Sequence, residues 1–239
     1  MKRTTQVQFL GMAIMAVTLF PFNAKSQSAP VTQTTMSADV RAKSDSDQEK
    51  KAAEWIAGLD LNDVAKGIRL KTAVADHLKA IRDWHNEHPY TTVPAGINPT
   101  TGNKLSDLDR QIIANSAMPV TVHEKLMSSL RKDLSEAQVE AVMDRFTVGK
   151  VAFTMAGYKA IVPNLTAAEE YTILNYLKQA REQALDYKNM NQISAIFEIY
   201  KSKAELYLNS NGRSWKQMYK DYTNKIKAKK AEDAKSGAK

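Results

Sequence analysis

The chain has 239 residues, of which 25% are charged and 43% apolar, a balance that excludes a polytopic membrane protein and a disordered chain. It contains no cysteine, which excludes disulfides, thiolate metal sites and a cysteine nucleophile. The formal net charge is +8, but residues 1–26 contribute +3 and residues 225–239 contribute +4, so the near-neutral remainder predicts no nucleic-acid partner.

Residues 1–26 have the pattern of a secretory signal peptide. Lys2 and Arg3 precede an apolar run over residues 9–20. As a helix this run would rise about 18 Å, too short for a hydrocarbon core of about 30 Å. The small residues Ala24 and Ser26 then suit a signal peptidase. We expect cleavage near Ser26/Gln27 and a periplasmic or secreted mature protein without a transmembrane segment.

The mature chain is expected to comprise three parts. Residues 27–44 are rich in Ser, Thr, Gln and Ala without apolar periodicity, which predicts a flexible leader. Residues 45–224 show apolar spacings of three and four and few turn residues. They are predicted to form one all-α domain, a bundle of about seven to eight helices. Residues 225–239 are expected to be a lysine-rich, solvated tail.

A long helix is expected from Asn62, its N-cap, to Glu87, where Pro89 ends it. The loop at residues 89–103 holds three prolines and two glycines, and irregular stretches of this length are often functional. Later helix starts are signalled by Ser106 with Asp109, Pro119, Ser135 with Gln138, and Thr166 with Glu169. Residues 149–162 fit either a helix or a strand.

The long helix carries an unusual polar cluster near its C-terminal end. At about 100° per residue, His85 stands within the apolar stripe, His88 lies one turn on, and Trp84 lies at the edge. One interpretation is a core histidine bonded to a carbonyl and a second histidine favoured by the helix dipole. The other is a ligand site at the mouth of the loop that begins with Tyr90. Two histidines without a fixed third ligand predict no metal site.

Arg181 is the second anomaly, because it falls inside the apolar stripe of its predicted helix. A buried guanidinium needs a carboxylate or carbonyl partner. It forms either a structural ion pair with a neighbouring helix or a clamp for a ligand carboxylate or hydroxyl group. We expect Trp84, His85, His88, Tyr90 and Arg181 to converge on one pocket.

Motifs of common enzyme classes are missing from the sequence. It contains no His-Glu-x-x-His, no glycine-rich phosphate loop, no Gly-x-Ser-x-Gly and no EF-hand spacing. The acid pairs that occur fall at predicted helix starts, where the helix dipole favours them. We therefore expect no cofactor, and the sequence leaves open whether the protein is an enzyme.

Five segments resemble one known family: residues 134–139, 144–149, 158–166, 177–186 and 197–201. Together they are similar to the domain-of-unknown-function family 3826 over roughly residues 50–224. The segment Ala-Arg-Glu-Gln-Ala, at residues 180–184, is the most specific part. The resemblance implies an exported bacterial protein, often encoded beside plant-polysaccharide degradation systems and described as a candidate sugar-binding protein. The family provides no catalytic residues to transfer.

Three functions follow from these observations. The first is a carbohydrate-binding or accessory protein of a plant-polysaccharide utilisation system, with a saccharide ligand. The second is a glycosidase or polysaccharide lyase that uses the histidine and arginine cluster for proton transfer. The third is a ligand-free structural or protein-interaction module. The sequence identifies neither the sugar nor the oligomeric state.

Overall fold

The computed structural model describes residues 36–99 and 101–236, and within these ranges it confirms the all-α fold as a single-domain bundle. The described residues form nine α-helices, rather than the seven or eight expected, and the short 3-10 helix η1 (Tyr90–Thr92). The α-helices are α1 Ala38–Ala57, α2 Val64–Glu87, α3 Asp107–Ser116, α4 Val120–Asp133, α5 Glu136–Thr147, α6 Lys150–Ile161, α7 Ala167–Ala184, α8 Met190–Ser210 and α9 Trp215–Ser236. The predicted signal peptide, residues 1–26, lies outside the described residues. None of the helices described is both long enough and apolar enough to span a membrane.

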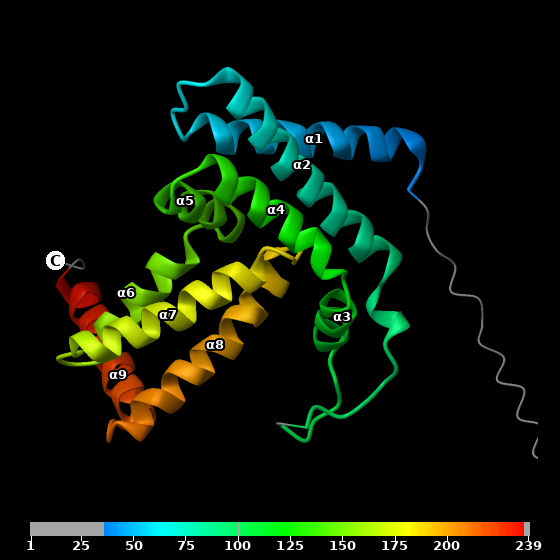
Figure 1. Cartoon of the computed structure of the whole chain (residues 1–239). Helices are drawn as coiled ribbons and strands as arrows, with labels where there is room; N and C mark the ends of the chain where they lie inside the picture. The colour runs from blue at the N-terminus through cyan, green and yellow to red at the C-terminus, as the bar shows by residue number, and fades with distance from the viewer. Residues whose placement is uncertain (1–35, 100, 237–239) are drawn as a thin grey trace, which may run out of the picture. The chain divides into compact units, whose positions relative to one another are not determined.

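Two groups of helices build the core, and each contains a pair of long antiparallel helices (Figure 1). The first group packs α1 and α2 against α4 and α5, and the second packs α7 and α8 with α6. Leu185, directly after α7, is buried in the first apolar cluster, whereas Tyr187 is buried in the second. The chain that leaves α7 therefore lies at the seam between the two clusters.

Three predicted capping boxes form as expected, at Ser106, Ser135 and Thr166. In each, the hydroxyl accepts from the backbone N–H three residues on, and the side chain there accepts from the cap residue's own N–H. The start of α2 differs by one residue, because Asp63 and not Asn62 caps it. An ionised carboxylate is the stronger acceptor for the free N–H groups of a first turn.

The predicted leader at residues 27–44 is helical from Ala38 onward, so this part of the prediction is wrong. Ser37 caps α1, and Arg41 and Asp45 form ion pairs with α2. These first turns are attached by charge rather than by apolar contacts, and a search for apolar periodicity does not detect them. At the other end, α9 continues to Ser236, so the predicted domain boundary at residue 224 falls inside a helix.

The undecided segment is helix α6, and a left-handed turn precedes it. Val148 and Gly149 have φ of +52° and +65°. Glycine adopts this conformation freely, but a β-branched residue is strained there. The two backbone N–H groups both donate to the carbonyl oxygen of Asp144, and so close the C-terminal end of α5.

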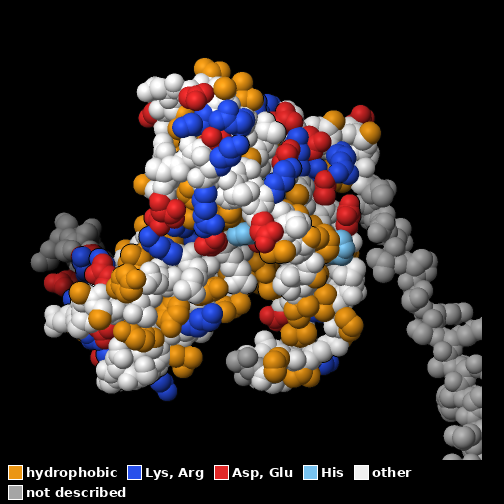
Figure 2. All heavy atoms as spheres, viewed as in Figure 1, with side chains coloured by type: hydrophobic (Ala, Val, Ile, Leu, Met, Phe, Trp, Pro, Cys, Tyr) orange, Lys and Arg blue, Asp and Glu red, His pale blue; other side chains and the backbone are white. Residues whose placement is uncertain are grey.

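Acidic and basic side chains are interspersed on the face shown in Figure 2, over α1, α2 and α4. Ion pairs between helices include Arg69 with Asp133 and Lys79 with Glu49. Exposed pairs of this kind stabilise a fold by at most about 1 kcal/mol each. The presence of both acidic and basic side chains on this face agrees with the near-neutral net charge calculated for the chain between its two basic ends.

Candidate functional site

Trp84 and His88 lie together at the C-terminal end of α2 and contact each other. Their rings are stacked with centroids 3.6 Å apart. The indole N–H of Trp84 donates to the carbonyl oxygen of Ala114 on α3, at 3.1 Å. The Nδ1 atom of His88 lies 3.0 Å from the carbonyl oxygen of Trp84. One face of the indole ring is therefore covered by protein.

Tyr90 begins η1, and the loop that follows folds back on α3. The guanidinium of Arg110 lies 5.2 Å from the centre of the Tyr90 ring and also donates to the carbonyl oxygen of Val93. An isolated antiparallel bridge joins Ile97 to Lys104. The loop is thus an ordered turn in its described part, and its first aromatic ring packs under an arginine.

His85 belongs to a chain of buried amides that connects α2, α3 and α8. The Gln192 side-chain amide donates to the Nδ1 atom of His85 at 3.1 Å, and its carbonyl oxygen accepts from the backbone N–H of Lys188. Gln111 on α3 continues the chain by donating to Asn115 and to a backbone carbonyl. Burial, followed by the charge of Lys188, lowers the pKa of His85. His85 is thus half-buried, and its partner is a side-chain amide rather than the carbonyl group of the structural interpretation.

Arg181 lies elsewhere, at the contact between α7 and α5. Only 2% of its surface is exposed, and it pairs with Asp144 at 2.8 Å and with Glu140 at 3.3 Å. The structure therefore brings Trp84 together with His88, but it does not bring Arg181 to them. All five predicted residues contact protein groups, and their binding of a ligand stays a prediction.

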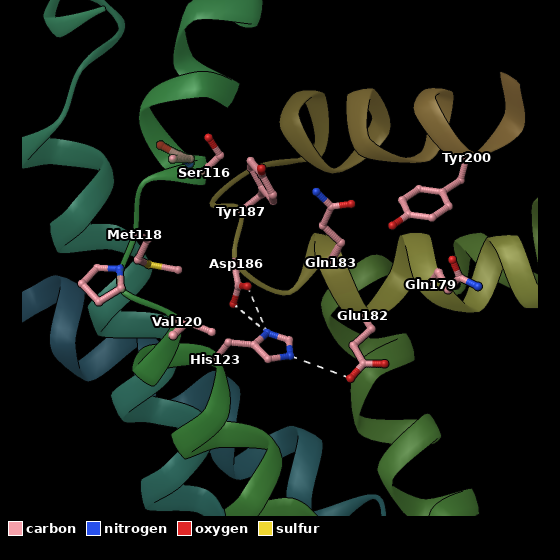
Figure 3. Close-up of a pocket in the computed structure, with 12 residues that line it drawn as sticks. Ser116, Met118, Val120, His123, Gln179, Glu182, Gln183, Asp186, Tyr187 and Tyr200 are labelled. Carbon is pink, nitrogen blue, oxygen red and sulfur yellow. Dashed lines mark hydrogen bonds and ion pairs between the residues drawn. The ribbon is translucent and has the colours of Figure 1, made fainter. Parts of the chain in front are cut away.

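A different set of polar residues surrounds a pocket of about 500 Å³ at the seam between the two core clusters (Figure 3). It lies between the connection from α3 to α4, the C-terminal end of α7 and the first half of α8. The residues that line it are Asn115, Ser116, Met118, Pro119, Val120, His123, Gln179, Glu182, Gln183, Asp186, Tyr187 and Tyr200.

His123 forms part of the wall of this pocket, with the acidic side chains of Asp186 and Glu182 next to it (Figure 3). Its Nδ1 atom lies 3.0 Å from a carboxylate oxygen of Asp186, and its Nε2 atom lies 3.8 Å from Glu182. The hydrogen bond to Asp186 raises the pKa of His123 above 6.5, which favours the imidazolium form. Glu182 also pairs with Arg131 at 3.2 Å, so local positive and negative charges nearly balance.

Asp186 faces a second histidine, the buried His77 of α2. The Nε2 atom of His77 lies 3.6 Å from Asp186 and 3.1 Å from the carbonyl oxygen of Leu185. Burial lowers the pKa of His77, so this imidazole is neutral and donates from Nε2 to the carbonyl. Asp186 therefore has a neutral histidine on its interior side, beyond hydrogen-bond distance, while its carboxylate reaches His123.

Tyr187 completes the inner wall as a neutral hydroxyl group. Burial raises its pKa to about 12, so the phenol keeps its proton throughout the physiological range. Gln179 and Gln183 are exposed along the rim on α7. No cluster of three or more histidine, cysteine or acidic side chains that could hold a metal ion occurs in the described part of the chain. The pocket therefore presents hydrogen-bond donors and acceptors on a nearly balanced charge.

Sequence reasoning missed His123 because it sought histidines within an apolar helical stripe. One signal was available: Glu182 and Asp186 are four residues apart, at the end of α7 and in the turn that follows it, and both belong to the segment that carries the resemblance. A histidine on another helix that faces this pair cannot be located without the packing of α4 on α7. The spacing of the two acids was visible in the sequence, but their partner His123 was not.

The comparisons with known proteins agree with the resemblance seen in the sequence. A search of curated proteins finds no match. A family described as proteins of unknown function (DUF3826) matches residues 45–228, a span that includes every residue lining the pocket. The match covers well over half of the chain, which therefore belongs to the DUF3826 family.

Proposed function

We propose that this protein is an exported carbohydrate-binding protein whose saccharide ligand occupies the pocket around His123, in the service of plant-polysaccharide utilisation. The observation that carries the proposal is the pocket itself. Its volume of about 500 Å³ falls in the range of ligand sites, about 300–1,000 Å³. Export rests on the signal-peptide pattern of residues 1–26, and intact mass spectrometry of the secreted protein tests it.

The chemistry of the lining favours a polyhydroxyl ligand. Each sugar hydroxyl both donates and accepts a hydrogen bond, and the pocket offers both kinds of partner in Gln179, Gln183 and Glu182. Tyr200 adds aromatic surface, which packs on the apolar faces of sugar rings. The near-balance of charge around His123 favours a neutral sugar unit over an ion.

Calorimetric titration with neutral plant oligosaccharides, chosen by a prior array screen, tests the proposal. The variants Gln179→Ala and Tyr200→Ala remove side chains from the pocket wall without emptying a buried core position. We expect each to weaken binding at least ten-fold. Gln217→Ala is the matched control, an exposed glutamine outside the pocket, and should bind as the parent does.

The same samples separate the two alternatives. Chromatography of the sugar after incubation shows whether new reducing or unsaturated ends form, which would make the protein a glycosidase or lyase. Failure of every saccharide to bind would overturn the proposal in favour of a ligand-free module. Binding that persists in both pocket variants would move the site elsewhere.

A further inference from the structure

A second concave surface lies between α6 and α9, away from the residues of the His123 pocket. This aromatic groove has a volume of about 460 Å³. The residues that line it are Phe153, Thr154, Ala156, Gly157, Tyr158, Ala160, Ile161, Lys201, Trp215, Tyr219 and Tyr222. Phe153 is 79% exposed and Tyr219 is 51% exposed, although both are large apolar side chains. Exposed apolar surface of this kind marks binding sites in soluble proteins.

The sequence builds the groove from an apolar strip on α9 and small residues on α6. Trp215, Tyr219 and Tyr222 are spaced by four and three residues, so they share one face of α9. That face packs on α6 and α8 at its beginning, where the Trp215 ring lies 5.2 Å from Tyr158 and 6.0 Å from Tyr219. The floor of the groove contains the small residues Ala156, Gly157 and Ala160 of α6. Because their side chains are short, the aromatic rings rise above the floor.

The helix that carries these rings is strongly basic. Seven lysines and three acids lie within α9. At about 100° per residue, Lys216 and Lys220 fall on one side of the aromatic strip, and Lys225 and Lys229 fall on the other. Within the described part of the chain, Lys216 and Lys220 form no ion pair. Their charge is available to an anionic occupant.

We propose that the aromatic groove binds an acidic, uronate-containing polysaccharide chain, with the rings on the apolar faces of the sugars and the α9 lysines on their carboxylates. The saccharide class rests on the proposed function, whereas the preference for acidic units rests on the charge of α9. Aromatic faces in the groove and ammonium groups that flank the aromatic strip on the same helix match a polymer with sugar rings and repeated carboxylates.

The shape of the groove favours this occupant over an anionic lipid bilayer. A helix that lies in a membrane interface buries a continuous apolar face by about 5–10 Å. Here Trp215 and Tyr222 are half-buried walls of a concave surface, and Phe153 and Tyr219 are the exposed rings beside them. A flexible chain can enter the groove, whereas a flat bilayer surface would contact chiefly its rim.

The experiment measures retention of the mature protein by polygalacturonate in affinity electrophoresis, followed by titration. The charge control is the same polymer with its carboxyl groups methyl-esterified. Phe153→Ala with Tyr219→Ala removes two exposed rings, and Lys216→Gln with Lys220→Gln removes two charges. Tyr171→Ala is the matched control, because this tyrosine is 67% exposed on α7 outside the groove.

We expect the free polyuronate to bind more tightly than its ester and to lose affinity as salt is raised. The ring variant should lose at least ten-fold in affinity for both polymers. The lysine variant should lose the preference for the free acid, and Tyr171→Ala should bind as the parent does. The pocket variants Gln179→Ala and Tyr200→Ala should retain polygalacturonate binding, so this inference and the proposed function can fail separately.

Three results would overturn the inference. One is equal binding of polygalacturonate by the parent and the ring variant. Another is binding to vesicles with 30% phosphatidylglycerol that depends on the same rings, in the absence of polyuronate binding. The third is a dimer, seen by light scattering, that is lost in the ring variant while the parent binds no polyuronate.

Discussion

α7 contributes to two clusters of acidic and basic side chains that differ in exposure. Around Arg181, a buried guanidinium pairs through its two terminal nitrogens with Asp144 and Glu140 on α5, while its Nε atom has no hydrogen-bond partner among the described residues. Around His123, the imidazole and its acids lie at the wall of a pocket. The comparison teaches that a charge within an apolar stripe indicates an ion pair, whereas partly exposed groups with remaining hydrogen-bond capacity indicate a ligand site.

The strongest test of this contrast leaves Arg181 buried without its acids. We expect Glu140→Gln with Asp144→Asn to lower the free energy of unfolding by about 3–5 kcal/mol, because an uncompensated charge stays buried. Adding Arg181→Met should recover about 1–4 kcal/mol, since an apolar side chain then replaces the charge. Urea unfolding followed by circular dichroism measures both changes.

Lys178→Ala is the control, since this exposed lysine also pairs with Glu140 and should change stability by less than about 1 kcal/mol. Further destabilisation on adding Arg181→Met would contradict the assignment. None of these variants should alter saccharide binding in the His123 pocket.

Glu169 provides the same test with an acid in the buried position. It is 5% exposed and accepts two hydrogen bonds from Arg213, which lower its pKa from 4.5 to about 2. Its pKa in the folded state is below the unfolded value, so the stabilisation is complete above pH 4.5 and is lost as the pH falls toward 2.

We expect Arg213→Leu to destabilise the protein by about 1.5–3 kcal/mol at pH 7, the usual range for hydrogen bonds to a charged group. The variant should also lose less stability than the parent between pH 5 and pH 2. Acid unfolding of the two proteins, followed side by side, measures this difference. If both lose stability equally steeply as the pH falls, the prediction is wrong.

The fold was largely predictable because its elements carry local signals. Capping boxes at Ser135 and Thr166 mark helix starts through a hydrogen-bond pattern that four residues complete by themselves. The first turns of α1 escaped prediction because long-range ion pairs hold Arg41 and Asp45. Local patterns therefore predict elements well, and miss what a distant partner stabilises.

The candidate site was less predictable for the same physical reason. The acids Glu182 and Asp186 are close in the sequence, but His123 joins them only where α4 meets the C-terminal end of α7 in the tertiary fold. Conversely, Trp84 and Arg181 stand out in the sequence because they lie at or inside an apolar stripe, and in the fold each bonds to a protein group. Which partner a buried polar group finds is a property of the tertiary fold.

Asp186 allows a finer test, because it faces two histidines whose pKa values shift in opposite directions. The pKa of His123 is raised chiefly by its hydrogen bond to Asp186, and the pKa of His77 is lowered chiefly by burial. We expect Asp186→Asn to lower the pKa of His123 and to leave His77 below 6.5. Two-dimensional NMR of the histidine rings across pH 4–9 measures both.

The sign of the effect on stability follows from the raised pKa of His123. Its pairing with Asp186 stabilises the fold fully below pH 6.5 and is lost as the pH rises through the folded-state pKa. The Asp186→Asn variant should therefore lose more stability at pH 5.5 than at pH 9. A raised His123 pKa that survives in this variant would assign the shift to Glu182 instead.

The smallest expected effect concerns Val148, which closes the helix end that presents Asp144 to Arg181. Its φ of +52° strains a β-branched residue, and its side chain is 72% exposed, so little packing holds it in place. Val148→Asn should raise the free energy of unfolding by about 0.5–1 kcal/mol, since asparagine tolerates the left-handed region and keeps the N–H donated to Asp144. Val148→Ala keeps most of the strain and should gain less. Because the turn bonds to the backbone carbonyl of Asp144 and to neither carboxylate, adding Val148→Asn to the Glu140→Gln, Asp144→Asn protein should give the same gain as in the parent. A gain that vanishes in that background would mean that the strained turn and the Arg181 ion pair are coupled, and that the α5 contact depends on backbone geometry as well as on charge.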